Sequence, residues 1–399
     1  MKRFLILLLL VVPLFFSCHR TGVKSIERQD IFSLDVGPME DQIALYMLGG
    51  AGTGKRPGLA MRDGFFYISD AVGGKIVSYN SYGDLLFMIY NEETNPAPIN
   101  LKTKADENLH VTRWAYSYPL HEPGEIAVDS RKHIFVEDRL PPERHSFDSE
   151  NRALLDRIVL HFDSDGRFVE YLGQEGIGGS AFPRISALCS SVNDELAVVC
   201  RLPEGWNIYW FNSGALLYMV QLKNQAIPVP EDWPNVYYSV DSVLAAPDAR
   251  KIYIKVDYYR ETFDESTNTH SGNEPYGSVI WILNAEDGVY TASLRLPFYE
   301  TSISENGNRI SIRNLYAMLG AIRNERFFLY YPIEDGFSLM VAGNNAQDRR
   351  RAAIRIDTDS MQFNVFSLTA DGLLSAMVVD DWKATLAWWR TDKLIGITQ

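Results

Sequence analysis

The stretch from Arg56 to Ile89 constrains the fold most, because it holds four short apolar runs separated by turn residues. The first two runs flank Arg62-Asp63-Gly64, and an Asp-Gly pair between apolar runs is a strong signal of a tight hairpin turn. The last two flank Ser81-Tyr82-Gly83-Asp84, and Gly73-Gly74 separates the two hairpins. The stretch therefore predicts one antiparallel four-stranded unit. Such a unit cannot bury both of its faces alone, so it requires further copies.

A second copy begins at Pro123 with PGEIAVDSRKHIFVED and continues, after an insertion, with DRIVLHFDSDGRFVEYLG. Fainter copies follow along the chain. The last of these holds FFLYYP, FSLMVAG, AAIRIDT and FNVFSLT, and the final segment offers only the three runs LLSAMVVDD, KATLAWWRT and KLIGIT. The sequence therefore contains five full units and one that lacks a strand. The fainter copies occupy residues 182–220, 240–296 and 316–368, and the final segment occupies residues 372–399.

The missing strand is expected at the other end of the chain, where IFSLDVG and QIALYML precede the first full unit. Radial repetition of four-stranded sheets is a β-propeller. An amino-terminal strand that completes the last unit removes an exposed sheet edge. We therefore predict an all-β, six-bladed propeller over residues 31–399, with seven blades as the alternative if IFSLDVG and QIALYML belong to separate sheets. A pair of stacked β-sandwiches does not explain the truncated last unit.

The two best copies resemble the NHL repeat, whose pattern is Pro-x-Gly-hydrophobic-Ala-Val-Asp, then a Tyr-Val-Ala-Asp-like strand, then an Arg-hydrophobic-x-x-Phe strand and Gly. Only the residue between Pro and Gly is missing from both copies. The resemblance implies an NHL-like propeller that acts as a binding scaffold. The matching pairs are Pro57-Gly58 with Pro123-Gly124, Ser69-Asp70 with Glu137-Asp138, and Gly83 with Gly166.

The amino terminus reads as an export signal. Residues 1–17 combine the basic pair Lys2-Arg3 with an apolar run from Phe4 to Phe16, a pattern typical of a signal peptide. That run is shorter than the roughly 20 residues of a spanning helix. Cys18 follows it as in a relaxed bacterial lipobox, similar to those of spirochaetes. We expect an exported lipoprotein, anchored to a membrane of the bacterial envelope through acyl chains on Cys18, with residues 18–30 as a polar tether. An ordinary signal peptide with an incidental cysteine is the alternative.

The net charge and the absence of catalytic motifs argue against several classes of function. The formal net charge of −13 disfavours a nucleic-acid partner. The glycine-rich GGAGTGKR before Pro57 lacks the Ser or Thr and the helix of a phosphate-binding loop. No HExxH, CxxC or GxSxG motif occurs, and no cofactor is predicted. Propeller lactonases assemble a metal site from single side chains on several strands. Candidates for such a site here are Asp70, Asp129 and Asp138, whose alternative role is to stabilise turns of the repeat.

Long connections are expected on one face of the propeller. In each blade the connection between the second and third strands shares a face with the connections between blades, which we call the loop face. The tight turns lie on the opposite, tight-turn face. We assign four long segments to the loop face, where binding residues usually reside. The segments are residues 91–121, 139–156, 258–277 and 342–351.

Partner-binding candidates come from three of these segments. Aromatic residues and arginine are enriched at interface hot spots. The alternatives are that the aromatics pack their segment onto the neighbouring blade, and that the arginine run ending at Arg351 is solvated surface. The candidates are Arg113, Trp114, Tyr116, Tyr118, Arg144, His145, Arg349 and Arg350.

These features predict a protein-interaction scaffold whose partner is a protein or another envelope macromolecule. The first alternative is a metal-dependent propeller hydrolase or lactonase with a site in the central tunnel, and the second is a structural envelope component. Cys189 and Cys200 lie about equally far from the turn at Asn193-Asp194. They form a disulfide if they face each other across the two strands, and remain two free thiols otherwise.

Overall fold

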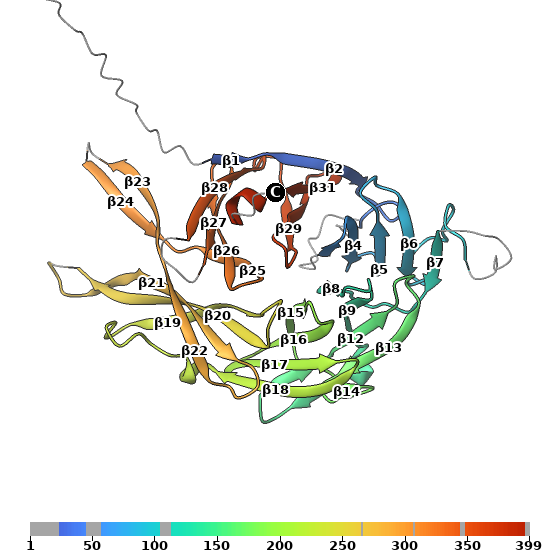
Figure 1. Ribbon diagram of the computed structural model, residues 1–399, viewed down its shortest axis with the longest axis horizontal. Coiled ribbons are helices and arrows are strands. Elements are labelled where there is room, and N and C mark those ends of the chain that lie inside the picture. Colours follow the sequence, from blue (N-terminus) through green and yellow to red (C-terminus); the bar gives the residue numbers. More distant parts are fainter. Residues whose placement is uncertain are drawn as a thin grey trace, which may run out of the picture.

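The computed structural model describes residues 24–44, 57–103, 113–264, 266–305, 308–343 and 348–395. Six blades of antiparallel strands surround a central axis (Figure 1). The innermost strands of successive blades contact one another around a complete ring. The chain is therefore a six-bladed β-propeller, as the repeat count predicts. The innermost strands, in ring order, are β3, β8, β15, β19, β25 and β29.

The first two blades each carry an added fifth strand at the outer edge. Blade 1 contains β3 (Gly58–Arg62), β4 (Phe65–Asp70), β5 (Lys75–Tyr79) and β6 (Leu85–Tyr90), with β7 (Trp114–Ser117) parallel to β6. Blade 2 contains β8 (Ile126–Val128), β9 (Ile134–Arg139), β12 (Arg157–Phe162) and β13 (Phe168–Gly173), with the short β14 (Gly176–Ile177) beside β13.

Blades 3 and 4 have four strands each. Blade 3 contains β15 (Ile185–Ser190), β16 (Glu195–Leu202), β17 (Gly205–Asn212) and β18 (Ala215–Lys223). Blade 4 contains β19 (Tyr237–Ala245), β20 (Lys251–Phe263), β21 (His270–Asn284) and β22 (Tyr290–Leu296). A separate hairpin of β23 (Tyr299–Glu305) and β24 (Asn308–Asn314) leads to the next blade. The sequence-based prediction assigned no strand to residues 299–314.

An amino-terminal strand closes the ring. Blade 5 contains β25 (Ala317–Ile322), β26 (Arg326–Ile333), β27 (Gly336–Ala342) and β28 (Arg349–Arg355), with β1 (Lys24–Ile26) parallel to β28. Blade 6 contains β29 (Phe363–Leu368), β30 (Leu374–Val379) and β31 (Lys383–Trp389), and its fourth strand is β2 (Arg28–Asp35), antiparallel to β31. The IFSLDVG segment thus supplies the strand that the last unit lacks.

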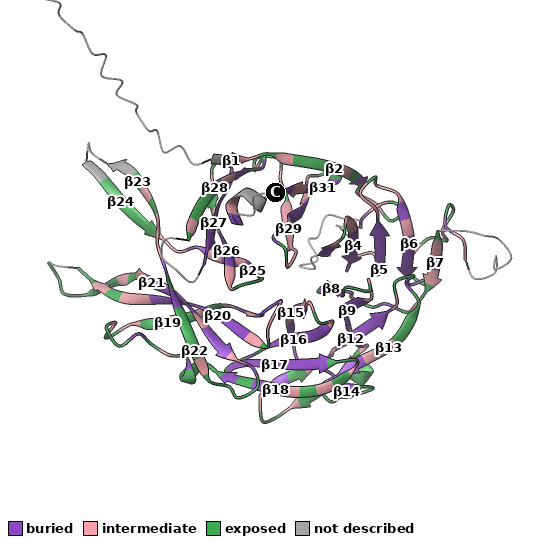
Figure 2. Cartoon of the chain, in the orientation of Figure 1, coloured by how far each residue is buried: buried purple, intermediate pink, exposed green. Residues whose placement is uncertain are grey.

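The hydrophobic core lies between neighbouring blades, and Figure 2 shows buried residues concentrated in the blade strands. Leu34 of β2 is buried together with Met377 of blade 6 and Ile68 of blade 1. Phe32 packs edge-on against Phe66, with ring centroids 5.5 Å apart. The borrowed strand therefore joins the first blade to the last through apolar packing as well as through the β-ladder.

The predicted tight turns lie on one face. Asp63 and Gly64 link β3 to β4 with φ angles of 51° and 79°, which is why an Asp-Gly pair occupies this turn. Arg28 pairs with Trp389 at the end of β31, so β2 starts at the tight-turn face and runs to the loop face. Residues 24–30, which we expected to belong to the tether, lie in β1 and the start of β2 apart from Glu27.

The assignment of strands to the last two blades differs from the prediction. The first strand of blade 5 is Ala317–Ile322, so FFLYYP is the second strand and FNVFSLT begins blade 6. The short AMLGAI run carries a weaker strand signal than the apolar runs that follow it. As a consequence, residues 343–348 connect the third strand to the fourth. The assignment of segment 342–351 to the loop face was therefore wrong. The start of the KLIGIT run, which was predicted as a strand, lies in the short helix α1 (Asp392–Ile395), and the rest of the run lies outside the described residues.

Candidate interaction surface

Three of the four predicted segments do connect to the loop face. Segment 91–121 joins β6 to blade 2, segment 139–156 joins β9 to β12, and segment 258–277 is the outer part of the β20–β21 hairpin with its tip. Within them, the 139–156 segment has the most distinctive surface. It contains a short 3-10 helix, η2 (Pro142–Arg144), and a hairpin of β10 (Ser146–Asp148) and β11 (Ala153–Leu155).

Asp148 shapes the tip of this hairpin. Its Oδ1 atom accepts hydrogen bonds from the backbone N–H groups of Glu150, at 2.9 Å, and Asn151, at 3.0 Å. Its Oδ2 atom accepts one from Nδ2 of Asn151 at 2.7 Å, and these bonds hold the pKa of Asp148 below its ordinary value. An aspartate that binds the backbone two residues ahead is a standard way to start a turn.

The hairpin presents an apolar pair to solvent. Phe147 and Leu154 are direct cross-strand partners, and they remain 66% and 44% exposed. Sequence reasoning selected the neighbouring Arg144 and His145 and missed this pair. Arg144 is exposed at the end of η2, while Nε2 of His145 lies 2.7 Å from the carbonyl oxygen of Leu140 and donates to it. His145 thereby fixes the fold of the segment.

Partly buried ion pairs hold the base of the 139–156 segment. Arg139 binds Asp156 at 2.9 Å and Glu122 at 3.3 Å. Next to it, Arg157 binds Glu137 at 3.2 Å. Asp156 and Glu137 are almost fully buried, so these carboxylates depend on their arginine partners. The segment is consequently a fixed support for its exposed tip.

A cavity of about 500 Å³ lies between this tip and blade 3. Asn151 accepts a hydrogen bond from Gln221 at 3.3 Å, and Arg152 forms an exposed ion pair with Glu204 at 3.3 Å across the cavity wall. Amide and charged side chains supply both donors and acceptors, which suits the polar groups of a peptide. The lining residues are Glu150, Asn151, Arg152, Leu202, Pro203, Glu204, Gly205, Gln221, Leu222, Lys223, Asn224 and Gln225.

The candidate aromatics of the 91–121 segment lie on the outer rim of blade 1. Trp114 and Tyr116 belong to β7 and are half-buried, and Arg113 pairs with Asp84 at 3.0 Å. The ring of Tyr118 packs against the rings of Phe162 and Phe168 of blade 2, with centroid distances of 5.5 and 4.9 Å. The packing role considered for these aromatics therefore holds for Tyr118.

The arginine run lies at the start of β28, the fourth strand of blade 5. Arg349 donates to the carbonyl oxygen of Arg295 at 2.7 Å, and Arg351 donates to that of Phe298 at 3.4 Å. Burial and the neighbouring Arg351 lower the pKa of Arg349. Arg350 is exposed. At least two of the three arginines thus brace the connection between blades 4 and 5.

The central channel contains one distinctive carboxylate. A cavity of about 270 Å³ runs between the innermost strands, and Glu125, which directly precedes β8, lines it. The side chain reaches the solvent of the channel, yet protein surrounds it. Enclosure and the nearby Glu137 raise its pKa to about 7. Glu125 is therefore a potential proton acceptor in the channel.

The predicted metal candidates do not converge. Asp70 and Asp138 lie at the loop-face ends of β4 and β9, while Asp129 lies in a tight turn. Each carboxylate accepts hydrogen bonds from backbone N–H groups, the turn-stabilising role that was the alternative. Within the described ranges, no three or more His, Cys, Asp or Glu side chains group as metal ligands. The N–H donors are Ala44 and Gly73 to Asp70, Arg131 and His133 to Asp129, and His121 and Glu122 to Asp138.

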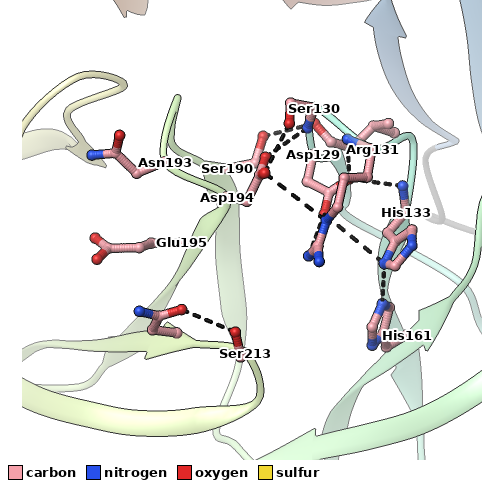
Figure 3. A network of polar contacts seen from close by, with 12 residues as sticks. Asp129, Ser130, Arg131, His133, His161, Ser190, Asn193, Asp194, Glu195 and Ser213 are labelled. Atoms are coloured by element: carbon pink, nitrogen blue, oxygen red, sulfur yellow. Dashed lines mark hydrogen bonds and ion pairs between the residues drawn. The ribbon is translucent and has the colours of Figure 1, made fainter.

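A polar network joins blades 2 and 3 on the tight-turn face (Figure 3). Asp194 accepts hydrogen bonds from the N–H and Oγ of Ser130, both at 2.8 Å. Arg131 pairs with Asp129 at 3.0 Å and approaches Asp194 at 3.9 Å. Hydrogen bonds and an ion pair thus connect residues of two blades, so the network fixes the position of one blade relative to the next.

Two histidines extend this network. Nδ1 of His161 lies 3.2 Å from Glu170. Nε2 of His161 lies 3.0 Å from Nδ1 of His133 (Figure 3). Because the carboxylate of Glu170 accepts, His161 carries its proton on Nδ1, and its Nε2 accepts from His133. Burial lowers the pKa of His161 and favours this neutral form.

The two cysteines of blade 3 are free thiols. The strand register pairs Cys189 with Ala197 and Cys200 with Ile185. Their side chains also enter different cores, on opposite faces of the blade. The disulfide considered from the sequence is therefore not formed, because similar distances from a turn did not make the cysteines cross-strand partners.

The predicted leader and Cys18 lie outside the described residues. No helix in the described part of the chain is long and apolar enough to span a bilayer.

Comparison with known proteins gives similarity of structure only. No protein-family model matches the sequence, and no curated protein matches it. A gluconolactonase from Xanthomonas campestris matches with a TM-score of 0.40 and 11% identity over 91% of this chain and 99% of its own. Streptogramin B lyase matches with a TM-score of 0.37 and 10% identity over 90% of this chain and 98% of its own. The β-propeller domain of the Trilobed protease from Pyrococcus furiosus matches with a TM-score of 0.38 and 10% identity over 84% of this chain and 96% of its own. Similarities of this size transfer no activity to the chain.

Proposed function

We propose that this protein is an exported, lipid-anchored, NHL-like β-propeller that binds a protein partner through the loop face of blades 2 and 3. The observation that carries the proposal is the cross-strand pair Phe147 and Leu154, which is 66% and 44% exposed. Exposed apolar patches rimmed by polar residues commonly mark interaction sites. Ion pairs to buried carboxylates hold the supporting segment, so little conformational freedom is lost on binding.

Partner capture tests this proposal directly. The full-length protein and a Phe147→Ser/Leu154→Ser variant are used as baits in a detergent extract of the source envelope. The variant should recover about tenfold less of the wild-type partner, because it loses the apolar contact. Tyr82→Ser is the matched control, since Tyr82 is an aromatic residue with 88% exposure on the tight-turn face. Equal partner recovery by wild type and the double variant would contradict the proposal.

The anchor follows from the sequence pattern around Cys18. The described chain begins with β1, which pairs with β28 at the outer edge of blade 5. Metabolic labelling with a fatty-acid probe, compared between wild type and Cys18→Ser, tests the anchor. Loss of label in the variant supports it, and equal labelling excludes it.

The alternative function is a metal-dependent hydrolase with a site in the channel. Glu125 favours it, because a channel carboxylate with a pKa of about 7 suits a general base. Metal analysis and assays on lactones and esters would test the alternative. Hydrolysis that is lost in Glu125→Gln would support it, while the absence of hydrolysis in the wild type would reject it.

A further inference from the structure

The outermost strands of this propeller repeatedly accept an added strand. β7 lies parallel to β6 in blade 1, β1 lies parallel to β28 in blade 5, and β14 pairs with β13 in blade 2. β14 also reaches β18 of blade 3, but only through Gly176 and Ala215. Within the described residues, no strand pairs with the outer side of Leu216–Lys223. We call this outer side the β18 edge.

The β18 edge directs unpaired backbone groups outward. Along an antiparallel ladder, successive residues point their N–H and C=O groups alternately toward and away from the paired strand. The carbonyl oxygen of Leu222 faces β17, since a Cβ placed on Gly205 of β17 would clash with it. By this alternation Val220 also faces β17, whereas Met219 and Gln221 present their N–H and C=O groups to an incoming strand.

The side chains of the β18 edge are unusually apolar for an open edge. Leu217 is 41% and Met219 is 47% exposed. Natural edge strands usually discourage pairing with charges or proline, and here Lys223 at the very end is the sole charge along the strand. β22 of blade 4 differs, because it exposes the small residues Thr291, Ala292 and Ser293.

The β18 edge is bounded at both ends. β14 occupies Ala215 at one end, and the cavity of about 500 Å³ beside Gln221 and Lys223 lies at the other. The intervening edge is about 25 Å long at the rise of a β-strand. This length fits a short extended segment, and the donors and acceptors of Asn151 and Gln221 suit its end.

We propose that the β18 edge binds an extended peptide segment of a partner protein as an added strand whose end enters the neighbouring cavity. This inference rests on the proposed protein-binding function and specifies the form of the partner. Backbone hydrogen bonds supply affinity in this binding mode, while contacts to alternate side chains supply specificity. Leu217 and Met219 select apolar residues in the bound segment.

Peptide selection with proline variants tests the inference. A phage-displayed library of random peptides of about ten residues, long enough to cover most of the edge, is selected on the full-length protein in detergent. Affinities of the selected peptides are then measured by fluorescence polarisation. Met219→Pro removes an outward N–H without breaking the β17 ladder and should weaken binding by at least about tenfold. Met219→Val keeps the N–H and serves as the matched control, with affinity expected within about threefold of the wild type.

The outcomes separate the peptide mode from the general function. Failure to select any peptide, or selected peptides that bind Met219→Pro as well as wild type, would overturn the inference. Circular dichroism checks that Met219→Pro is folded. A second variant, Gln221→Pro, removes another outward N–H and should weaken peptide binding in the same way. A wild-type dimer in sedimentation that Met219→Pro dissociates would also overturn it, because the edge then binds a second copy. Partner capture that depends on Phe147 but not on Met219 would leave the proposed function standing and reject only the added strand.

Discussion

Phe147 of β10 lies directly opposite Leu154 of β11, and both side chains face solvent at the tip of a hairpin whose base is held by ion pairs to buried carboxylates. A two-stranded hairpin has little stability of its own. Here Arg139, Asp156 and the hydrogen bond from His145 to Leu140 supply the missing support. The propeller therefore holds an apolar contact in a fixed place on its loop face.

Ring closure makes a first prediction. Leu34→Ala should lower the free energy of unfolding by about 2–5 kcal/mol, because it opens a cavity in the core between blades 6 and 1. Ser33→Ala, which removes an exposed hydrogen bond to Thr385, should cost no more than about 1 kcal/mol. Denaturant unfolding monitored by tryptophan fluorescence measures both. Equal stability of Leu34→Ala and wild type would show that β2 does not close the ring.

The buried charges of blade 4 make a second prediction. Lys255 is fully buried and binds Asp257 at 2.8 Å and Asp241 at 3.3 Å. Lys255→Met should destabilise the fold by about 3–5 kcal/mol at pH 7, because Asp257 then loses its counter-charge. Burial already raises the pKa of Asp257.

Acidification should reduce this destabilisation. Without Lys255, folded Asp257 binds a proton more readily than the unfolded chain does, so the stability of the variant rises relative to wild type as the pH falls through that raised pKa. Unfolding at pH 7 and pH 5 tests the sign. Lys223→Met, at an exposed lysine, is the control. A pH-independent difference from wild type would contradict the role of Asp257.

His161 makes a third prediction, on pH. Its pKa is lowered by burial, and it faces Glu170, His133, Asp129 and the ring of Phe135. The folded state therefore binds fewer protons than the unfolded state below the ordinary pKa of about 6.5. The contribution of His161 to stability is complete above that pH and is lost as the pH falls toward the lowered pKa.

A glutamine substitution isolates this effect. In His161→Gln, the side-chain amide can still donate to Glu170 and accept from His133, so stability at pH 8 should change by no more than about 1 kcal/mol. The loss of stability between pH 7 and pH 5 should become smaller. His270→Gln, at an exposed histidine, should keep the wild-type pH profile. An unchanged profile in His161→Gln would contradict the assignment.

The thiols make a fourth prediction. Burial raises the pKa of Cys189 to about 11 and raises that of Cys200 further above its ordinary value. In a Cys18→Ser background, a thiol reagent at pH 8 should label neither cysteine in the folded protein, because the reactive thiolates are scarce. Both should react after unfolding without a reductant. Absence of labelling in the unfolded protein would reveal a disulfide.

The propeller architecture could be predicted from the sequence because turn residues and short apolar runs mark each strand of the repeat. Asp63-Gly64 marks a turn, and IFSLDVG supplies the one strand that the last unit lacks. The first strand of blade 5 was not predictable in the same way. AMLGAI is short and contains Gly320, so its signal was weaker than those of the neighbouring runs.

The candidate surface was only partly predictable. The position of segment 139–156 follows from blade topology, and that prediction was confirmed. The exposure of Phe147 depends on β10 and β11 projecting as a separate hairpin, which apolar patterning alone does not reveal. The open edge of β18 depends on where β14 stops, a tertiary relationship with no local sequence signal.

Site-specific photo-crosslinking tests the central claim most directly. A photoreactive phenylalanine analogue is placed at Phe147 or at Tyr82, two aromatic positions exposed by 66% and 88% on opposite faces. Binding through the loop face of blades 2 and 3 predicts a partner adduct from position 147 and none from position 82. An adduct from position 82 alone, or equal adducts from both positions, would contradict the proposed surface.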